Sequence, residues 1–210
     1  MSYCDWDKAS QECKNYHDTE WGVPLHDDQK QFEFLMMEVM QCGLSWNLMI
    51  QKRNIFRQCF DDFNFDKIAR YNQQDIDRIL NTSGMIKSPR KIRAIIHNVK
   101  CFQKIREEFG SFDNYLWAYS EGQTILFDKH NQGYIPVSNT LSETISKDLK
   151  KRGFQFLGPV VVYSHLQACG IINDHDENCP RYDYIVKNFP TICQKCDGEK
   201  GLHYFGKDFK

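Results

Sequence analysis

Apolar residues recur every three or four positions along most of this chain, which is the spacing of helices that bury one face. The clearest stripe lies in residues 30–41 and is formed by Phe32, Leu35, Met36, Val39 and Met40. Glu38 falls inside this apolar run, although carboxylates are rarely buried unless they are paired or used. Taken alone, the segment favours Glu38 on the polar side of the helix, facing solvent. The rest of the chain changes that interpretation.

The same spacing predicts further helices and an all-α fold class. Aspartates 66 and 75, Ser88-Pro89 and Thr140-x-x-Glu143 give typical start signals. Trp46 is expected on a tight turn after a helix that ends near Gly43. Residues 123–139 are expected to form a polar loop, and strand-like alternation is short and ambiguous at 154–157 and 160–163. The expected helices cover residues 47–60, 66–71, 75–81, 88–109, 111–120, 140–152 and 158–170.

Composition narrows the class of protein. The 210 residues suffice for one domain or two small lobes, and the net charge of −1 predicts no global attraction to nucleic acid or membranes. The start of the chain is polar and no run of 18 apolar residues occurs, so a cytoplasmic, soluble monomer without membrane contact is expected. The nine cysteines are an odd number, which favours reduced thiols and metal ligands over a disulfide framework.

Cysteine and histidine pairs near both ends suggest metal binding. Cys4 and His17 lie near the N-terminus, and His175 and Cys179 form an H-x3-C pair far along the chain. Two thiolates and two imidazoles would make a closed tetrahedral zinc site. The spacing alone leaves chance pairing open, since the chain has nine Cys and seven His. A second set, Cys193-x2-Cys196 with His203, favours a mobile tail over another metal site.

A basic stretch follows a short glycine-containing turn at residues 83–88. Residues 84–106 contain seven basic residues and no acidic one. Backbone amides at such a turn, including Gly84, can point at a phosphate, and Lys87, Arg90 and Lys91 follow it directly. The segment therefore predicts local phosphate contacts on a nearly neutral protein. An ordinary solvated helix face is the alternative.

The chain is also rich in aromatic residues, which make up 14% of it. Most aromatic side chains belong to cores. Faces close to a carboxylate can also hold a flat cationic ring by stacking and cation–π attraction. The candidates near Glu38 are Trp6, Tyr16, Trp21 and Trp46.

Four segments together resemble the type I 3-methyladenine DNA glycosylases, and their order and spacing agree over about residues 1–180. The segments are Tyr16-His-Asp-Thr-Glu-Trp-Gly22, Glu38 with Gly43-Leu-Ser-Trp46, residues 151–158, and Gln167-Ala-Cys-Gly170 with Asn173-Asp-His175. Residues 181–210 have no counterpart in this resemblance, so they are expected to form a C-terminal extension of open role. The turn at 83–88 is also less glycine-rich than is usual in the wider superfamily.

The resemblance implies a two-lobed helix-hairpin-helix fold with its hairpin near residues 82–88. It implies a structural Zn²⁺ on Cys4, His17, His175 and Cys179, and places base contacts at Glu38, Tyr16 and Trp46. Leu44 falls where the family has a wedge for the gap left by an extruded nucleotide. The implied activity is hydrolytic release of 3-methyladenine from alkylated double-stranded DNA. No position marks a Schiff-base lysine, so strand cleavage is not expected.

Two other classes of function compete with this expectation. A zinc-stabilised module that recognises damaged DNA would bind without releasing a base. A zinc hydrolase acting on small molecules would need an open coordination position, and four protein ligands would leave none.

Overall fold

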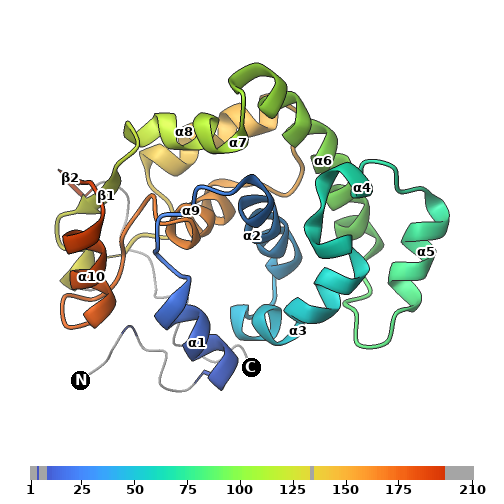
Figure 1. Cartoon of the computed structure of the whole chain (residues 1–210), viewed down its shortest axis with the longest axis horizontal. Helices are drawn as coiled ribbons and strands as arrows, with labels where there is room; N and C mark the ends of the chain where they lie inside the picture. Colours follow the sequence, from blue (N-terminus) through green and yellow to red (C-terminus); the bar gives the residue numbers. More distant parts are fainter. Residues whose placement is uncertain (1–3, 5–8, 133–134, 197–210) are drawn as a thin grey trace.

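Helix α2 (Asp28–Gln41) lies near the centre of the fold, with α9 and α3 on either side of it (Figure 1). The computed structural model describes residues 4, 9–132 and 135–196. The side chain of Asp27 accepts a hydrogen bond from the backbone of Lys30 and begins the helix. Residues 31–40 are all buried, because α3, α6, α7 and α9 pack around α2. The predicted apolar stripe is therefore confirmed, and the helix is covered on its polar side as well.

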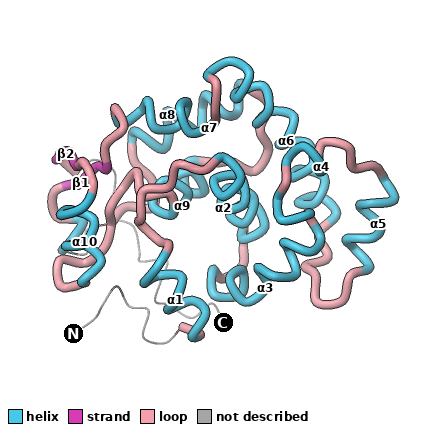
Figure 2. The backbone as a smooth tube through the Cα atoms, viewed as in Figure 1, coloured by secondary structure: helices cyan, strands magenta, loops and turns pink. Residues whose placement is uncertain are grey.

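The remaining helices surround α2 in chain order, and helix dominates the described residues (Figure 2). Helices α8 and α9 pack together, as do α6 and α7, while α5 extends to one side next to α6. Short 3₁₀ turns lie at Asp61–Phe63, Ala118–Ser120 and His130–Gln132. The α-helices are α1 (Gln11–Thr19), α3 (Trp46–Cys59), α4 (Phe65–Ile68), α5 (Gln73–Asn81), α6 (Pro89–Phe109), α7 (Phe112–Trp117), α8 (Thr140–Lys151), α9 (Pro159–Ala168) and α10 (Pro180–Asn188).

Several helix starts differ from the prediction by a few residues, and the capping side chain explains each difference. Asn64 and Asn72 cap α4 and α5, in place of the expected aspartates. Asn139 forms a capping box with Ser142, which displaces the expected Thr140 and Glu143 box. Asparagine is as good a cap as aspartate, so the choice depends on which residue lies at the last extended position. Trp46 begins α3 after its cap Ser45, and is not on the preceding turn.

The prediction of a polar loop over residues 123–139 is wrong at its beginning. Strand β1 (Thr124–Phe127) pairs in parallel with β2 (Thr191–Gln194), with Thr124 opposite Thr191 and Phe127 opposite Gln194. Each strand has four residues, which is too short for alternation to stand out in the sequence. The two strands are also far apart along the chain, so no hairpin signal links them. The fold is mostly helical, with this small sheet at its edge (Figure 2).

The pairing of β2 also corrects the expectation of a mobile tail for residues 191–196. Helix α10 runs past residue 181, and β2 then joins the sheet through its backbone. Cys193 and Cys196 lie in this described part, whereas His203 lies outside the described residues. None of the helices in the described part of the chain combines the length and apolar character that crossing a membrane requires.

Two glycines bring distant segments into contact where a side chain would not fit. A Cβ on Gly170, at the end of α9, would lie 2.5 Å from the backbone of Val23 and Pro24. A Cβ on Gly22 would lie 2.8 Å from the ring of His175. Both residues also have positive φ angles, which glycine adopts without strain. The loop after α1 is thereby held against the end of α9.

Candidate functional site

Glu38 lies near the C-terminal end of α2 with only 3% of its surface exposed. Its Oε2 atom is buried and has no hydrogen-bond partner among the described residues. Burial raises the pKa of this carboxyl group to about 8. A buried carboxyl with an open hydrogen-bonding position is costly to stability, and such groups are more common at functional sites than elsewhere. The solvent-facing alternative for Glu38 is therefore wrong.

Aromatic rings from three helices gather on the side of α2 that carries Glu38. Phe34 lies one helical turn before Glu38 and so shares its face. The ring of Tyr16, from α1, meets Phe34 edge-on with centroids 5.8 Å apart. It also meets Trp46, the first residue of α3, at 5.6 Å and an angle of 53°. Tyr16 and Trp46 are both buried, so the predicted pair lies together.

The charge of Glu38 acts on the pKa values of two buried side chains, Tyr16 and Cys169. Burial raises the pKa of Tyr16, and the Glu38 carboxylate raises it further. Burial also raises the pKa of Cys169, just after α9, and the Glu38 carboxylate raises it further. The prediction of site residues missed Cys169, although it lies in the Gln167–Gly170 segment of the sequence. A buried thiol in such a segment gives no chemical signal apart from its place in the fold.

The four predicted metal ligands converge in the structure. Atoms of Cys4, His17, His175 and Cys179 all lie within 4.8 Å of one another. The Sγ atom of Cys179 is 3.8 Å from Nε2 of His17 and 3.6 Å from Nδ1 of His175. A tetrahedral zinc bound to two sulfurs and two nitrogens separates its ligand atoms by roughly 3.3–3.8 Å. The donor set and its spacing therefore fit Zn²⁺.

Groups around this cluster orient its histidine rings and stabilise its thiolates. Nε2 of His175 is 3.1 Å from the carbonyl oxygen of Trp21, and Nδ1 of His17 is 2.8 Å from Asp18. Each histidine thus directs its other ring nitrogen towards the cluster, as metal-binding histidines do. The backbone amide of Asp176 also donates to Sγ of Cys4. Hydrogen bonds from Cys4, His17 and His175 hold the pKa of Cys179 well below its usual range.

Trp21 packs against two of the predicted metal ligands. Its ring stacks on His17 at 5.8 Å and meets His175 edge-on at 4.5 Å. This position gives Trp21 a part in packing the ligand cluster, and its contact with the base stays a prediction. Trp6, the other tryptophan predicted at the base site, lies outside the described residues.

The glycine turn lies between α5 and α6, as predicted. Gly84 is exposed and has a φ of +77°, and its carbonyl oxygen accepts a hydrogen bond from Nζ of Lys52. Lys87 and Arg90 are exposed beside it. The guanidinium of Arg90 lies 5.6 Å from the ring of Phe156. Leu44 is half-exposed between α2 and α3.

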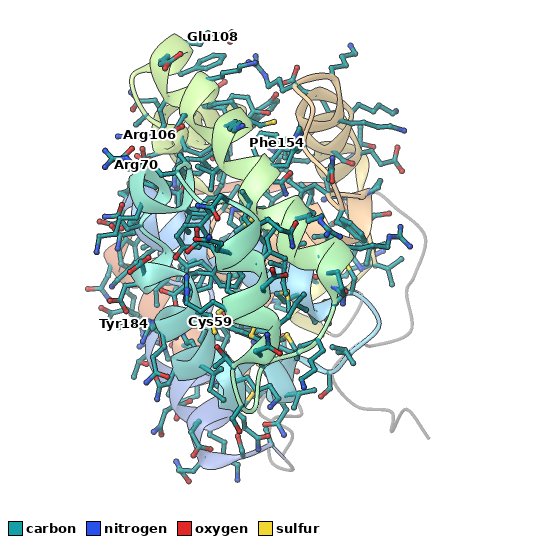
Figure 3. All side chains as sticks on the ribbon, turned by 90° about the vertical axis from the view of Figure 1, so that its right-hand side faces the viewer. Cys59, Arg70, Arg106, Glu108, Phe154 and Tyr184 are labelled. Carbon is teal, nitrogen blue, oxygen red and sulfur yellow. The ribbon has the colours of Figure 1, made fainter. Side chains whose placement is uncertain are left out.

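Two of the seven basic residues in the stretch donate hydrogen bonds to α2 or to the residue that ends it. Lys91 donates to the carbonyl oxygens of Met40 and Cys42, both at 2.7 Å. Arg106, near the end of α6 (Figure 3), donates to Asp28 at 2.6 Å and lies 4.4 Å from the ring of Phe65. These two side chains bind α2 to α6, so the exposed positive face consists of Lys87, Arg90, Arg93, Lys100 and Lys104.

Solved structures with the same fold define the class of protein. One is a crystal structure of 3-methyladenine DNA glycosylase I, with a TM-score of 0.80 and 38% identity, covering 85% of this chain and 98% of that one. Another is a tyrosine-to-phenylalanine variant of 3-methyladenine DNA glycosylase I in complex with 3-methyladenine. It has a TM-score of 0.80 and 35% identity, and covers 86% of this chain and 97% of that one. The fold is that of a DNA glycosylase.

Sequence comparison gives the family. DNA-3-methyladenine glycosylase 1 of Escherichia coli K12 is 37% identical over 182 residues, which cover 87% of this chain and 97% of the relative. DNA-3-methyladenine glycosylase of Haemophilus influenzae is 35% identical over 177 residues, or 84% of this chain and 96% of the relative. Residues 6–182 match the methyladenine glycosylase family, and the chain belongs to it. The resemblance found in the sequence is confirmed.

Proposed function

We propose that this protein is a base-excision repair glycosylase that extrudes 3-methyladenine from alkylated double-stranded DNA and releases the base by hydrolysis. The observation that carries the proposal is the buried, unpaired Oε2 atom of Glu38 beside the rings of Tyr16 and Trp46. Relatives that are 35–37% identical over most of the chain carry the name of this activity. A carboxyl group and aromatic faces are what a flat, methylated base requires.

Glu38 would recognise the edge of the extruded base. Methylation at N3 leaves adenine in DNA with a positive charge, and this charge already weakens the bond to the sugar. A nearby cation favours the ionised carboxylate, so the bound lesion would lower the raised pKa of Glu38. Tyr16 and Trp46 would stack on the base. Since the leaving base is already cationic, the reaction needs extrusion, recognition and access of water more than a strong general acid.

The zinc site would be structural. Cys4, His17, His175 and Cys179 would fill all four positions of a tetrahedral ion, leaving none for a substrate. When bound, the ion supplies a crosslink between the N-terminal segment and the loop before α10. This crosslink holds α1, and with it Tyr16, against the rest of the fold. Reaction chemistry would then depend on the residues near Glu38 alone.

The turn between α5 and α6 would act as the DNA-binding hairpin of a two-lobed helix-hairpin-helix fold comprising residues 1–180. Its exposed Gly84 amide, with Lys87 and Arg90, would contact phosphates. Leu44, half-exposed close to Trp46 in the sequence, would fill the gap left by the extruded nucleotide. The protein would act as a monomer, and residues 181–210 would extend this domain.

Free-base release distinguishes this function from a zinc-stabilised module that binds damaged DNA. Duplex DNA treated with a methylating agent is incubated with the protein, and the released bases are separated by chromatography. A glycosylase releases free 3-methyladenine and leaves strands that break only after alkali, because it cuts no phosphodiester bond. Binding to methylated DNA without any free base would support the binding module and contradict the proposal.

A further inference from the structure

A buried carboxylate and imidazole pair lies at the small sheet, and its Asp174 directly precedes the predicted zinc ligand His175. Nδ1 of His130 is 2.7 Å from Oδ1 of Asp174, and both side chains are fully buried. The other oxygen of Asp174 accepts hydrogen bonds from Tyr163 at 2.7 Å and Gln167 at 2.8 Å. With two donors on one oxygen, the carboxylate is held as an acceptor. His130 therefore donates from Nδ1 to the other oxygen, which leaves Nε2 as an acceptor.

A thiol lies at that accepting nitrogen. Sγ of Cys196 is 3.3 Å from Nε2 of His130. Cys196 follows β2 and is half-exposed, so small molecules can reach it. It lies beyond residue 182, where the family match ends. Carboxylate, imidazole and thiol thus form a chain of contacts in the order that activates nucleophilic cysteines, with the base oriented by a third group.

We infer that Cys196 is an activated thiol, poised by His130 and Asp174 to react with small, soft electrophiles, and is thus a modification site outside the glycosylase machinery. The thiolate is the reactive form of cysteine, and a neighbouring imidazole stabilises it as an ion pair. Asp174 positions His130 so that Nε2 faces the thiol. Without this pair, a half-buried thiol would react more slowly than an exposed one.

A nearby carboxylate opposes the activation. The carboxylate of Asp128 accepts a hydrogen bond from the backbone amide of Cys196, so a negative charge lies close to the thiol. A negative charge nearby disfavours ionisation of the thiol. His130, in direct contact with the sulfur, outweighs Asp128, whose oxygen is already bonded to the amide. Removing the Asp128 charge should therefore make Cys196 more reactive.

The reaction balances with a haloacetamide as the electrophile. Nε2 of His130 takes the proton from Sγ of Cys196, and the thiolate attacks the halogen-bearing carbon. A sulfur–carbon bond forms as the carbon–iodine bond breaks, and iodide leaves. The proton stays on the imidazole, whose Nδ1–H still donates to Asp174, until it passes to water. The product is a stable thioether on Cys196.

The test compares two cysteines in one chain. Cys193 is exposed on β2, three positions before Cys196, and provides the matched control. Trypsin cuts after Lys195 and places the two cysteines on different peptides. The folded protein is treated briefly with iodoacetamide between pH 5.5 and 9, and both peptides are quantified by mass spectrometry. At pH 6.5 Cys196 should react at least about tenfold faster than Cys193, and its rate should level off at lower pH.

Two variants separate the effects of His130 and Asp128 on the reactivity of Cys196. His130→Gln should abolish the advantage of Cys196 over Cys193, whereas Asp128→Asn should increase the rate of Cys196 a few-fold. Circular dichroism checks the fold, and if His130→Gln does not fold, the unmodified chain and Asp128→Asn still decide the question. A Cys196 rate that is slower than that of Cys193 and follows the same pH curve would overturn the inference. So would two zinc ions per chain with Cys196 protected by the second, because the thiol would then be a metal ligand.

Discussion

Nζ of Lys91 lies 2.7 Å from the carbonyl oxygen of Cys42, at the residue that ends α2. It lies equally close to the carbonyl oxygen of Met40. The last carbonyls of a helix lack partners within it and carry partial negative charge. Lys91 therefore stabilises the end of the helix that bears Glu38. Its position in the sequence suggests a phosphate contact, but its ammonium group already has two partners within the protein.

Lys91 and Arg90 should thus behave differently when neutralised. Lys91→Met should lower the free energy of unfolding by roughly 1–3 kcal/mol, because two carbonyl groups lose a charged donor. Arg90→Gln, at an exposed position, should weaken binding to damaged and undamaged duplex alike and flatten the dependence of log K on log salt. Denaturant melts measure the effect of Lys91→Met, and salt titrations of DNA binding measure the effect of Arg90→Gln. An unchanged salt slope for Arg90→Gln would place the phosphate contacts elsewhere on the protein.

Loss of a metal ligand should cost both metal and stability. Cys4 and Cys179 are far apart along the chain, so the ion closes a very long loop. Cys4→Ala or Cys179→Ala should lower zinc content and melting temperature together, whereas Cys193→Ala, on exposed β2, should change neither. Elemental analysis and thermal melts measure the two quantities. A well-folded unmodified protein without bound metal would rule out the structural zinc.

The raised pKa of Glu38 predicts that its contribution to stability depends on pH. The folded protein keeps this proton up to about pH 8, whereas an unfolded chain releases it near pH 4.5. The folded state therefore binds more protons between these values, and stability falls as pH rises through the window. Glu38→Gln removes the titration, so its stability relative to the unmodified protein should increase from pH 5 to pH 8.

The gain in the free energy of unfolding of Glu38→Gln, relative to the unmodified protein, should be on the order of a few kcal/mol. One pKa unit corresponds to about 1.4 kcal/mol. Denaturant melts of both proteins at several pH values give the difference between their free energies of unfolding. The contributions of titratable groups that both proteins share cancel in this difference. Curves that stay parallel across the window would show that Glu38 is ionised in the folded protein, as a solvated carboxylate would be.

Helical periodicity predicts most of the fold because the apolar residues of the long helices recur at helical spacing. The stripe from Phe32 to Met40 identifies α2, and Ser88-Pro89 marks the start of α6. The strands were not predictable in this way. Four-residue strands have no measurable period, and the partner of Thr124 lies at Thr191. The choice between Asn72 and Asp75 as a cap depended on one backbone dihedral that composition does not determine.

The candidate site was predictable where a family motif coincides with unusual chemistry. Glu38 stands out as a carboxylate in an apolar run, and Cys4, His17, His175 and Cys179 have metal-ligand chemistry. Lys91 shows the limit of such reasoning. An ammonium group suits a phosphate and a backbone carbonyl equally well in the sequence. Only the fold shows that Lys91 donates to the carbonyl oxygen of Cys42.

The excision rate of Glu38→Gln tests the central claim most directly. Glutamine keeps the size and most of the hydrogen-bonding capacity of glutamate but cannot carry its charge. Neutral adenine offers no charge to match and has a stronger glycosidic bond, so the site should favour the cationic lesion in binding and in reaction. Loss of a hydrogen bond to a charged group costs about 1–3 kcal/mol, or roughly 5- to 150-fold in rate. Glu107→Gln, at an exposed position on α6, removes one charge without touching the site.

The measurement is the single-turnover rate of 3-methyladenine release from methylated duplex DNA by the unmodified protein and both variants, each shown to be folded by circular dichroism. The account predicts a rate about 5- to 150-fold lower for Glu38→Gln and an unchanged rate for Glu107→Gln. Excision by Glu38→Gln at the original rate would contradict it.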